Sequence, residues 1–194
     1  MTETLQTRVR QALLQDLDRN CSDVESSSGH NSAGPKLRRV LRTAPTVRYL
    51  AVFLFRLSQV LGERSGLAGS LVKQLNHILT GADLAWQASI GSGLVLYHPT
   101  GVVLGPHVSI GRSASLQQGV TIGGSGGAAG GAESSPTIGD NLVCGPGARV
   151  FGRIRLGNGV VVGANAVVVS DVPDGTTVVG IPARPLPPPS EGSQ

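Results

Sequence analysis

His98 is the residue of this sequence whose type and setting best suit chemistry. It follows a tyrosine and precedes a Pro-Thr-Gly turn in LVLYHPTGVV, residues 94–103, and it is one of only four histidines. An imidazole titrates near neutral pH, so it can take a proton from a substrate hydroxyl. The other interpretations are a core histidine and a metal ligand. No second ligand stands at a metal-binding spacing, so we expect no metal and favour a base.

The other candidate side chains have plainer interpretations. His77 falls near the end of a predicted helix, where it suits a C-terminal or packing position, and His107 falls at a corner. Cys21 and Cys144 form neither a CxxC motif nor a zinc spacing. Two such cysteines indicate no disulfide framework, which is typical of a cytoplasmic protein.

A six-residue period governs the sequence from residue 90 onward. In hexads the chain reads IGSGLV, LYHPTG, VVLGPH, VSIGRS, ASLQQG and VTIGGS, and it resumes in phase at residue 138 with IGDNLV. Eleven of the twelve first positions are aliphatic or alanine, and the other is a cysteine. The twelve are Ile90, Leu96, Val102, Val108, Ala114, Val120, Ile138, Cys144, Val150, Leu156, Val162 and Val168.

This period predicts a mainly β fold, a parallel β-helix of hexapeptide repeats. Six residues make one short strand and one tight corner, so three hexads close a triangular coil with the first positions on its axis. Such a core is narrow, which suits a chain with 28 glycines and only 3% aromatic residues. The stretch 126–137, GGAAGGAESSPT, loses the pattern but keeps the phase. We expect it to form an excursion loop that covers a site.

The first 80 residues have a helical period instead. We predict helices over 7–20, 44–62 and 66–79, with a Ser/Gly-rich mobile loop at 21–35. The predicted organisation is therefore a helical region, 1–80, a β-helix domain, 81–185, and a Pro-rich tail, 186–194.

The charge is concentrated in the helical region. Residues 1–80 contain 11 Lys and Arg against 6 Asp and Glu, whereas residues 81–194 contain 5 against 6. A solvated helix face is the plainest interpretation, and peripheral contact with an anionic membrane is the alternative; we expect no nucleic-acid partner. The longest apolar run, YLAVFLF at 49–55, is far shorter than the roughly 20 residues of a membrane span. The N-terminus has no apolar signal-peptide region, so we expect a cytoplasmic protein.

Residues 81–185 resemble the hexapeptide-repeat acyltransferases and, among them, the serine acetyltransferases. The stretches that carry the resemblance are GADLAWQASIGSGLVLYHPTGVVLG, QQGVTIGG and VVGIPARP. The resemblance implies a left-handed β-helix, a homotrimer with active sites between neighbouring coils, and acetyl-CoA or another acyl-CoA as donor. A left-handed coil departs from the usual right-handed crossover.

The resemblance also implies a catalytic pair. The family uses a histidine and an aspartate fifteen residues before it, and His98 and Asp83 stand at that separation. The imidazole acts as general base on the acceptor hydroxyl, while the carboxylate fixes its tautomer and stabilises the imidazolium.

Two departures concern the acceptor. The family usually carries an aspartate before its catalytic histidine, where this sequence has Tyr97, and an Arg-His pair in the excursion loop. Here that loop has Glu133, Ser134 and Ser135 and no cation. We therefore take these four residues as acceptor-binding and favour a neutral sugar, polysaccharide or secondary-metabolite hydroxyl. Tyr97 can stack on a sugar ring, or it can pack against a neighbouring subunit.

The donor is expected to lie along a groove lined by small residues, with Arg184 facing a CoA phosphate. The small residues assigned to it are Gly123, Gly124, Gly145, Ala148, Gly163 and Ala166. Each glycine can also be a plain turn residue.

Three functions remain open at this point. The first is an acyl-CoA-dependent O-acyltransferase acting on a neutral hydroxyl. The second is a serine O-acetyltransferase of cysteine biosynthesis. The third is a β-helix that binds or scaffolds without catalysis, against which the retained His98 and Asp83 argue.

Overall fold

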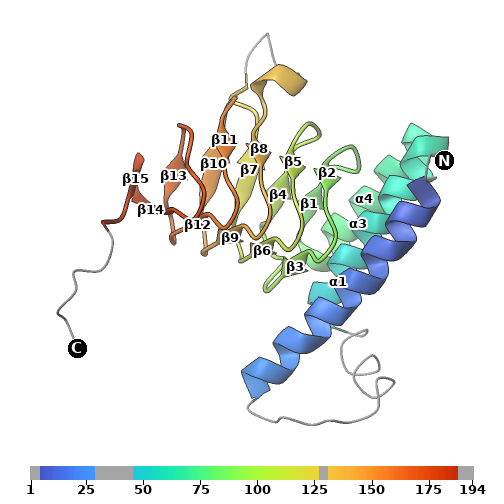
Figure 1. Ribbon diagram of the computed structural model, residues 1–194. Coiled ribbons are helices and arrows are strands. Elements are labelled where there is room, and N and C mark those ends of the chain that lie inside the picture. Colours follow the sequence, from blue (N-terminus) through green and yellow to red (C-terminus); the bar gives the residue numbers. More distant parts are fainter. Residues whose placement is uncertain (1–4, 29–45, 127–130, 188–194) are drawn as a thin grey trace.

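The computed structural model describes residues 5–28, 46–126 and 131–187 of the 194-residue chain. Three helices gather at the N-terminal end of a column of short strands, and the described chain ends at the opposite end of the column (Figure 1). The basic stretch 36–42 and most of the expected tail lie outside the described residues.

The helices are α1 (Leu5–Ser28), α3 (Val47–Arg64) and α4 (Gly66–Thr80). The side chains of Thr46 and Ser65 cap the last two by accepting backbone N–H bonds, as N-cap hydroxyls do. These two helices fall where the sequence predicts them. The expected loop at 21–35 is wrong for residues 21–28, which continue α1, and residues 29–35 lie outside the described part.

Helix α1 contacts the first coil where the expected loop begins. Asn20 is buried, and its amide donates to the carbonyl oxygens of Asp16 (2.7 Å) and Leu94 (3.0 Å). Cys21 is buried as well. A local Ser/Gly composition cannot reveal such a distant anchor.

Helices α3 and α4 cross at very close range. A Cβ atom on Gly69 would lie 2.6 Å from the Cα atom of Gly62, and one on Gly62 would lie 2.4 Å from the ring of Trp86. Neither position has room for a side chain. The two glycines thus fix α4, and Trp86 in the first coil, against α3.

The strands form three parallel faces. Neighbouring strands of a face are one coil apart in sequence, as Val103 opposite Asp83 on one side and Thr121 on the other illustrates. Face A holds β1 (Asp83–Leu84), β4 (Val103–Leu104), β7 (Thr121–Gly123), β10 (Arg149–Phe151) and β13 (Val167–Val168). Face B holds β2 (Ser89–Ile90), β5 (Ser109–Ile110), β8 (Thr137–Ile138) and β11 (Arg155–Leu156). Face C holds β3 (Val95–Leu96), β6 (Ser115–Leu116), β9 (Val143–Cys144), β12 (Val161–Val162), β14 (Thr177–Gly180) and an antiparallel β15 (Ala183–Pro185).

The core of the column is the axis predicted by the hexads. All twelve first-position side chains are at most 7% exposed. The predicted β-helix and its register are therefore confirmed. Burial raises the pKa of the Cys144 thiol to about 12, so this axis cysteine is protonated and unreactive near neutral pH.

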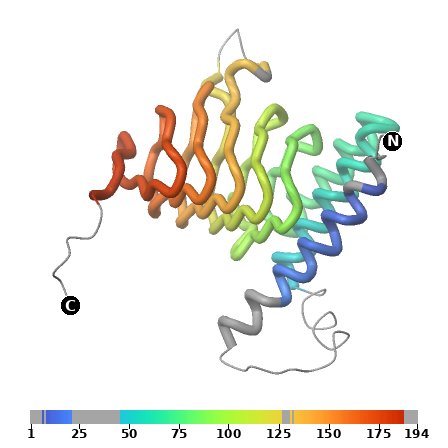
Figure 2. Tube along the Cα trace, viewed as in Figure 1, coloured from blue at the N-terminus to red at the C-terminus, as the bar shows by residue number. Residues whose placement is uncertain are grey.

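Three edges separate the faces, and each edge has its own residues. The A–B edge follows face A and carries Trp86, His107 and the excursion, with a short 3-10 helix η1 (Ala132–Ser134). The B–C edge carries the turn 91–94. The C–A edge carries the turn 97–102. Figures 1 and 2 show the coils stacked in order, with η1 standing out from the column between β7 and β8.

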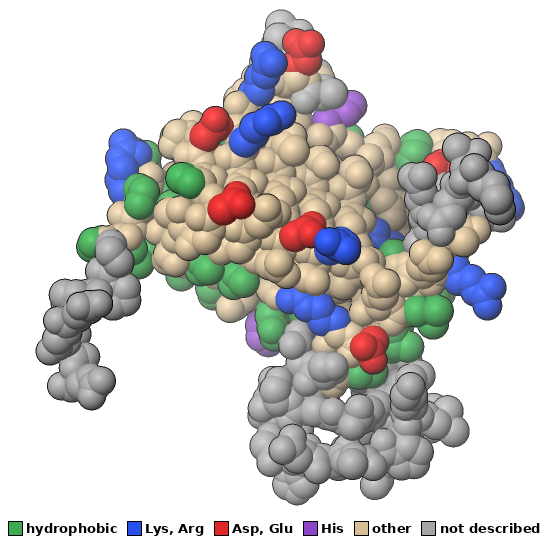
Figure 3. All heavy atoms as spheres, viewed as in Figure 1, with side chains coloured by type: hydrophobic (Ala, Val, Ile, Leu, Met, Phe, Trp, Pro, Cys, Tyr) green, Lys and Arg blue, Asp and Glu red, His purple; other side chains and the backbone are tan. Residues whose placement is uncertain are grey.

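Surface charge on the column is dispersed. In the view of Figure 3, blue and red side chains are scattered over the β-helix, and among the described residues on this face no broad basic patch forms. None of the described helices combines the length and the hydrophobicity that a membrane crossing needs.

Candidate functional site

The C–A edge brings Asp83 next to the turn that carries His98. Helix α4 ends at Gly81, whose left-handed φ of 75° turns the chain directly into β1, so Asp83 is the first residue of the first strand. One coil later, the N–H of Gly101 donates to the carbonyl of Gly81 (2.9 Å). The N–H of Asp83 donates to the carbonyl of Val102 (2.8 Å). The predicted pair therefore lies on two stacked turns of one edge.

His98 stands exposed at the start of its turn. The turn is closed by the N–H of Val102, which donates to the carbonyl of Pro99 (3.1 Å), and Gly101 adopts a φ of 72°. Because Leu96 points to the axis, the chain leaves the core two residues before the imidazole. A side chain in this position is accessible to an acceptor from outside the column.

The carboxylate of Asp83 contacts an ammonium in this structure. Its Oδ1 atom lies 2.5 Å from the Nζ atom of Lys73 on α4. Among the described residues, no hydrogen bond joins Asp83 to the imidazole of His98. Their catalytic pairing stays a prediction.

Lys73 is a charged neighbour of Asp83 that the sequence analysis did not identify. The sequence does hint at this contact, because Lys73 stands ten residues before Asp83 in a predicted helix that leads into the first strand.

Tyr97 faces the helical region. The guanidinium carbon of Arg48, on α3, lies 5.0 Å from the centroid of the Tyr97 ring, a cation–π distance. The Nε of Arg48 also donates to the side-chain oxygen of Asn20 (3.2 Å). Sequence reasoning missed Arg48, since only the packing of α3 on β3 reveals it. Tyr97 thus has a partner within its own chain, one residue from His98.

The three predicted acceptor residues of the excursion lie at a different edge. Glu133, Ser134 and Ser135 follow β7 of face A and precede β8 of face B, so they belong to the A–B edge. Within one chain the structure does not bring them to His98. Glu133 is exposed, whereas the hydroxyl of Ser134 donates to the carbonyl of Gly131 (2.9 Å).

The predicted donor residues divide between the same two edges. Gly145 and Gly163 follow face C strands and so share the C–A edge with His98, while Gly123 and Gly124 stand where the excursion leaves face A. Ala148 and Ala166 are also on the C–A edge, but both are fully buried, so their methyl groups belong to the core. Only the backbone of those two alanines is left to contact a ligand.

Arg184 is exposed on the last strand. It pairs with Val179 in the antiparallel contact of β15 with β14, and its Nη1 donates to the carbonyl of Ala183 (2.9 Å). It lies at the C-terminal end of face C, several coils from His98.

The helical region is anchored at the B–C edge by a buried ion pair. The Nε of Arg56 lies 2.9 Å from the Oδ2 of Asp16, and their side chains are 3% and 0% exposed. The Oδ1 of Asp16 accepts the N–H groups of Gly93 (2.6 Å) and Leu94 (2.8 Å). Arg56 also donates to the carbonyl of Ile90 (2.8 Å).

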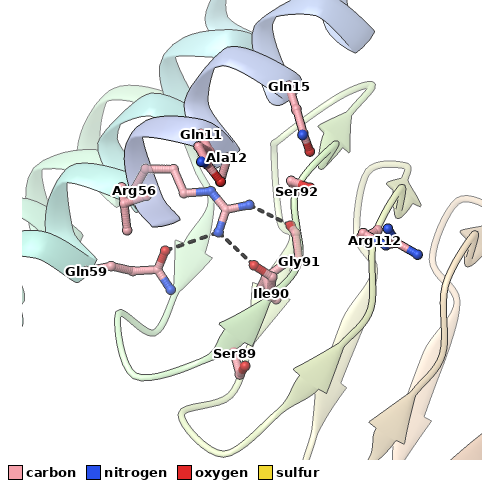
Figure 4. Close-up of a pocket in the computed structure, with 11 residues that line it drawn as sticks. Gln11, Ala12, Gln15, Arg56, Gln59, Ser89, Ile90, Gly91, Ser92 and Arg112 are labelled. Atoms are coloured by element: carbon pink, nitrogen blue, oxygen red, sulfur yellow. Dashed lines mark hydrogen bonds between the residues drawn. The ribbon is translucent and has the colours of Figure 1, made fainter. Parts of the chain in front are cut away.

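A cavity of about 380 Å³ lies beside this anchor, between α1 and the turn after β2 (Figure 4). The guanidinium of Arg56 reaches into it. It donates hydrogen bonds to the side-chain oxygen of Gln59 (3.2 Å) and to the carbonyls of Ile90 and Gly91. The cavity is at the B–C edge, away from His98. We therefore assign it to the docking of α1 and not to catalysis.

Among the described residues, no three His, Cys, Asp or Glu side chains lie close enough together to hold a metal ion. Scanning the sequence against protein-family models gives no match.

Relatives of known activity match most of the chain. A serine acetyltransferase of Mycobacterium tuberculosis is 37% identical over 163 residues, which cover 84% of this chain and 69% of that protein. A serine acetyltransferase of Helicobacter pylori is 37% identical over 162 residues, 77% of this chain and 94% of that protein.

Solved structures agree with these relatives. The serine acetyltransferase of Neisseria gonorrhoeae superposes with a TM-score of 0.77 and 32% identity over 93% of this chain and 66% of that one. The complex of that enzyme with serine gives a TM-score of 0.76 at 31% identity, covering 93% of this chain and 70% of that one. These structures therefore share the fold of this chain, as the resemblance implies.

The comparisons also bear on the acceptor. All of these relatives are serine acetyltransferases, so they favour serine, the second of our two acceptors, over the neutral hydroxyl that Tyr97 and the excursion suggested. The enzyme class expected from the sequence, acyl transfer from acetyl-CoA to a hydroxyl, is that of the relatives. With 37% identity along 84% of its length and the same β-helix, this chain belongs to the serine acetyltransferase family of acetyl-CoA-dependent O-acyltransferases.

Proposed function

We propose that this protein is a serine O-acetyltransferase that uses His98 as general base and Asp83 as its orienting partner. The observation that carries the proposal is the C–A edge, where two stacked turns hold this pair in a chain of that family. The cytoplasmic location stays a prediction.

The proposed reaction is a single acyl transfer. One ring nitrogen of His98 takes the proton of the serine hydroxyl as its oxygen attacks the thioester carbonyl of acetyl-CoA. The new C–O ester bond forms and the C–S bond breaks. The imidazolium, stabilised by the carboxylate of Asp83, returns the proton to the CoA thiolate. Gly145 and Gly163 on the C–A edge are proposed to contact the donor through their backbone. A Cβ atom at either would meet the next coil, 2.8 Å from the N atom of Ala164 and 2.7 Å from Cγ1 of Val179.

A neutral hydroxyl is the second candidate acceptor. Serine carries two charges, and removing either from water without a partner is costly. Tyr97 offers no carboxylate to the ammonium, and the excursion 126–137 has no Lys, Arg or His for the carboxylate. Lys73 and Arg48, on α4 and α3, are the cations that the structure adds near the C–A edge.

The test between the two is an assay of CoA thiol release with serine, homoserine, sugars and nucleosides as acceptors. We expect saturation by serine with a KM at or below about 1 mM, the upper end of common KM values. A linear response to serine, together with saturation by a sugar, would replace serine with the neutral acceptor. No CoA release with any acceptor would overturn the acyltransferase assignment.

We further propose a homotrimer. The excursion is at the A–B edge and His98 at the C–A edge of one chain, so a site that uses both needs a neighbouring copy. Two apolar side chains point outward on the faces beside His98: Val103 on face A is 37% exposed, and Val143 on face C is 38% exposed. Contact with neighbouring copies would remove both from water. Three chains of 19.8 kDa predict a particle of roughly 60 kDa by light scattering. A monomer of one third that mass would contradict the shared site.

A further inference from the structure

We propose that Lys73 is a positioning residue for acyl transfer, whose ammonium holds the carboxylate of Asp83 in place beside the turn of His98. The inference rests on the proposed reaction but not on which acceptor is used. Its primary observation is the 2.5 Å contact between the Nζ of Lys73 and the Oδ1 of Asp83.

The helix that carries Lys73 is rigidly joined to the strand that carries Asp83. Lys73 lies about two helical turns before the end of α4. The Thr80 hydroxyl donates to the Asn76 carbonyl (2.8 Å) and accepts the N–H of Ala82 (3.3 Å). Asn76 in turn donates to the carbonyl of Ala51 on α3 (2.9 Å). The backbone between the two charged residues therefore has little freedom. The Cα atoms of Lys73 and Asp83 are thus held at a fixed separation, which favours the ion pair.

The contact leaves half of the carboxylate available. Lys73 contacts Oδ1, and Oδ2 of Asp83 makes no hydrogen bond within the described residues. An orienting carboxylate needs one oxygen for the imidazole and a fixed plane. The side chain of Asp83 is 38% exposed, so without Lys73 it would rotate freely in water. Lys73 thus supplies the second restraint that such a carboxylate requires.

A role in stability does not explain the contact. With side chains 30% and 38% exposed, the pair is screened by solvent and contributes little to folding. An effect of Lys73 on rate without an effect on the melting temperature would therefore identify positioning.

The experiment compares Lys73→Met, Lys73→Arg and the exposed neighbour Gln74→Met as matched control, each assayed with acetyl-CoA and the best acceptor of the panel. We expect Lys73→Met to lower kcat about 10-fold with acceptor KM and Tm unchanged, because a small misplacement of the catalytic groups costs about that much or more. Lys73→Arg should restore most of the rate, and Gln74→Met should match the wild type.

A double variant separates the alternatives. In an Asp83→Asn background, Lys73→Met should have almost no further effect on kcat, since both changes remove the same restraint. The positioning role would be overturned by additive losses of kcat in the double variant or by an unchanged kcat in Lys73→Met. It would also be overturned if Lys73→Met raised the acceptor KM at normal kcat, because Lys73 would then be an acceptor ligand. Failure of the wild type with serine alone would overturn only the acceptor. Failure with all acceptors would overturn the reaction and this inference together.

Discussion

His98→Ala is expected to lower kcat by at least about 10²-fold and up to about 10⁴-fold, the usual contribution of a general base. The acceptor hydroxyl then has no group to take its proton. Since His98 is exposed at a turn whose hydrogen bonds are all made by the backbone, the variant should keep its melting temperature and oligomeric mass. Steady-state kinetics with acetyl-CoA, beside a thermal melt, are the measurements.

The control for His98 is an exposed residue on the B–C edge, away from both edges that the proposed site uses. The side chain of Arg112, between β5 and β6, is 72% exposed. Arg112→Ala should retain the full rate. Asp83→Asn should reduce kcat less than His98→Ala, because it disturbs the orientation of the base and leaves the base present. Near-normal turnover by His98→Ala would refute the catalytic assignment.

Asp16→Ala is expected to destabilise the docking of the helical region by about 3–5 kcal/mol, the usual cost of breaking a buried ion pair. The variant leaves the buried guanidinium of Arg56 without its carboxylate. It also leaves the N–H groups of Gly93 and Leu94 without their acceptor. Both penalties arise from polar groups that stay buried when one partner is removed.

Trp86 offers a direct probe of that loss. It is the only tryptophan, and its ring packs against Gly62 at the start of the column. Its fluorescence in a urea titration should show an earlier transition for Asp16→Ala than for the wild type. Gln11→Ala, an exposed change on the same helix, is the control and should leave the midpoint unchanged. Equal midpoints for all three proteins would show that the anchor does not hold the helices.

The choice of acceptor shows that local sequence features can omit charged groups which the fold brings to the site. Tyr97 and the excursion, taken alone, pointed to a neutral hydroxyl, because the two charged groups expected for serine are missing there. The packing of α3 and α4 introduces Arg48 beside Tyr97 and Lys73 beside Asp83. A cation absent from the excursion can thus be supplied by a helix that only the fold brings near, as Arg48 on α3 illustrates.

The hexad pattern alone predicts the β-helix and its register. Twelve first positions, from Ile90 to Val168, share one phase, and every one of them is buried on the axis. A repeat predicts structure well because each coil contacts only its neighbours, so local pattern and global fold coincide. The same repeat puts His98 outside the core, while the separate helical period of the first 80 residues predicts α3 and α4 ahead of the first coil.

Which charged groups meet depends on the packing of the helices on the column. The pairs Asp16–Arg56 and Lys73–Asp83 and the Arg48–Tyr97 stack join helices to the column across contacts that no repeat encodes. The contact of α1 with the first coil, through buried Asn20, is set in the same way. The faces also separated Glu133 from His98 within one chain, because the order of strands around the column, and not distance along the sequence, sets the edge to which each residue belongs.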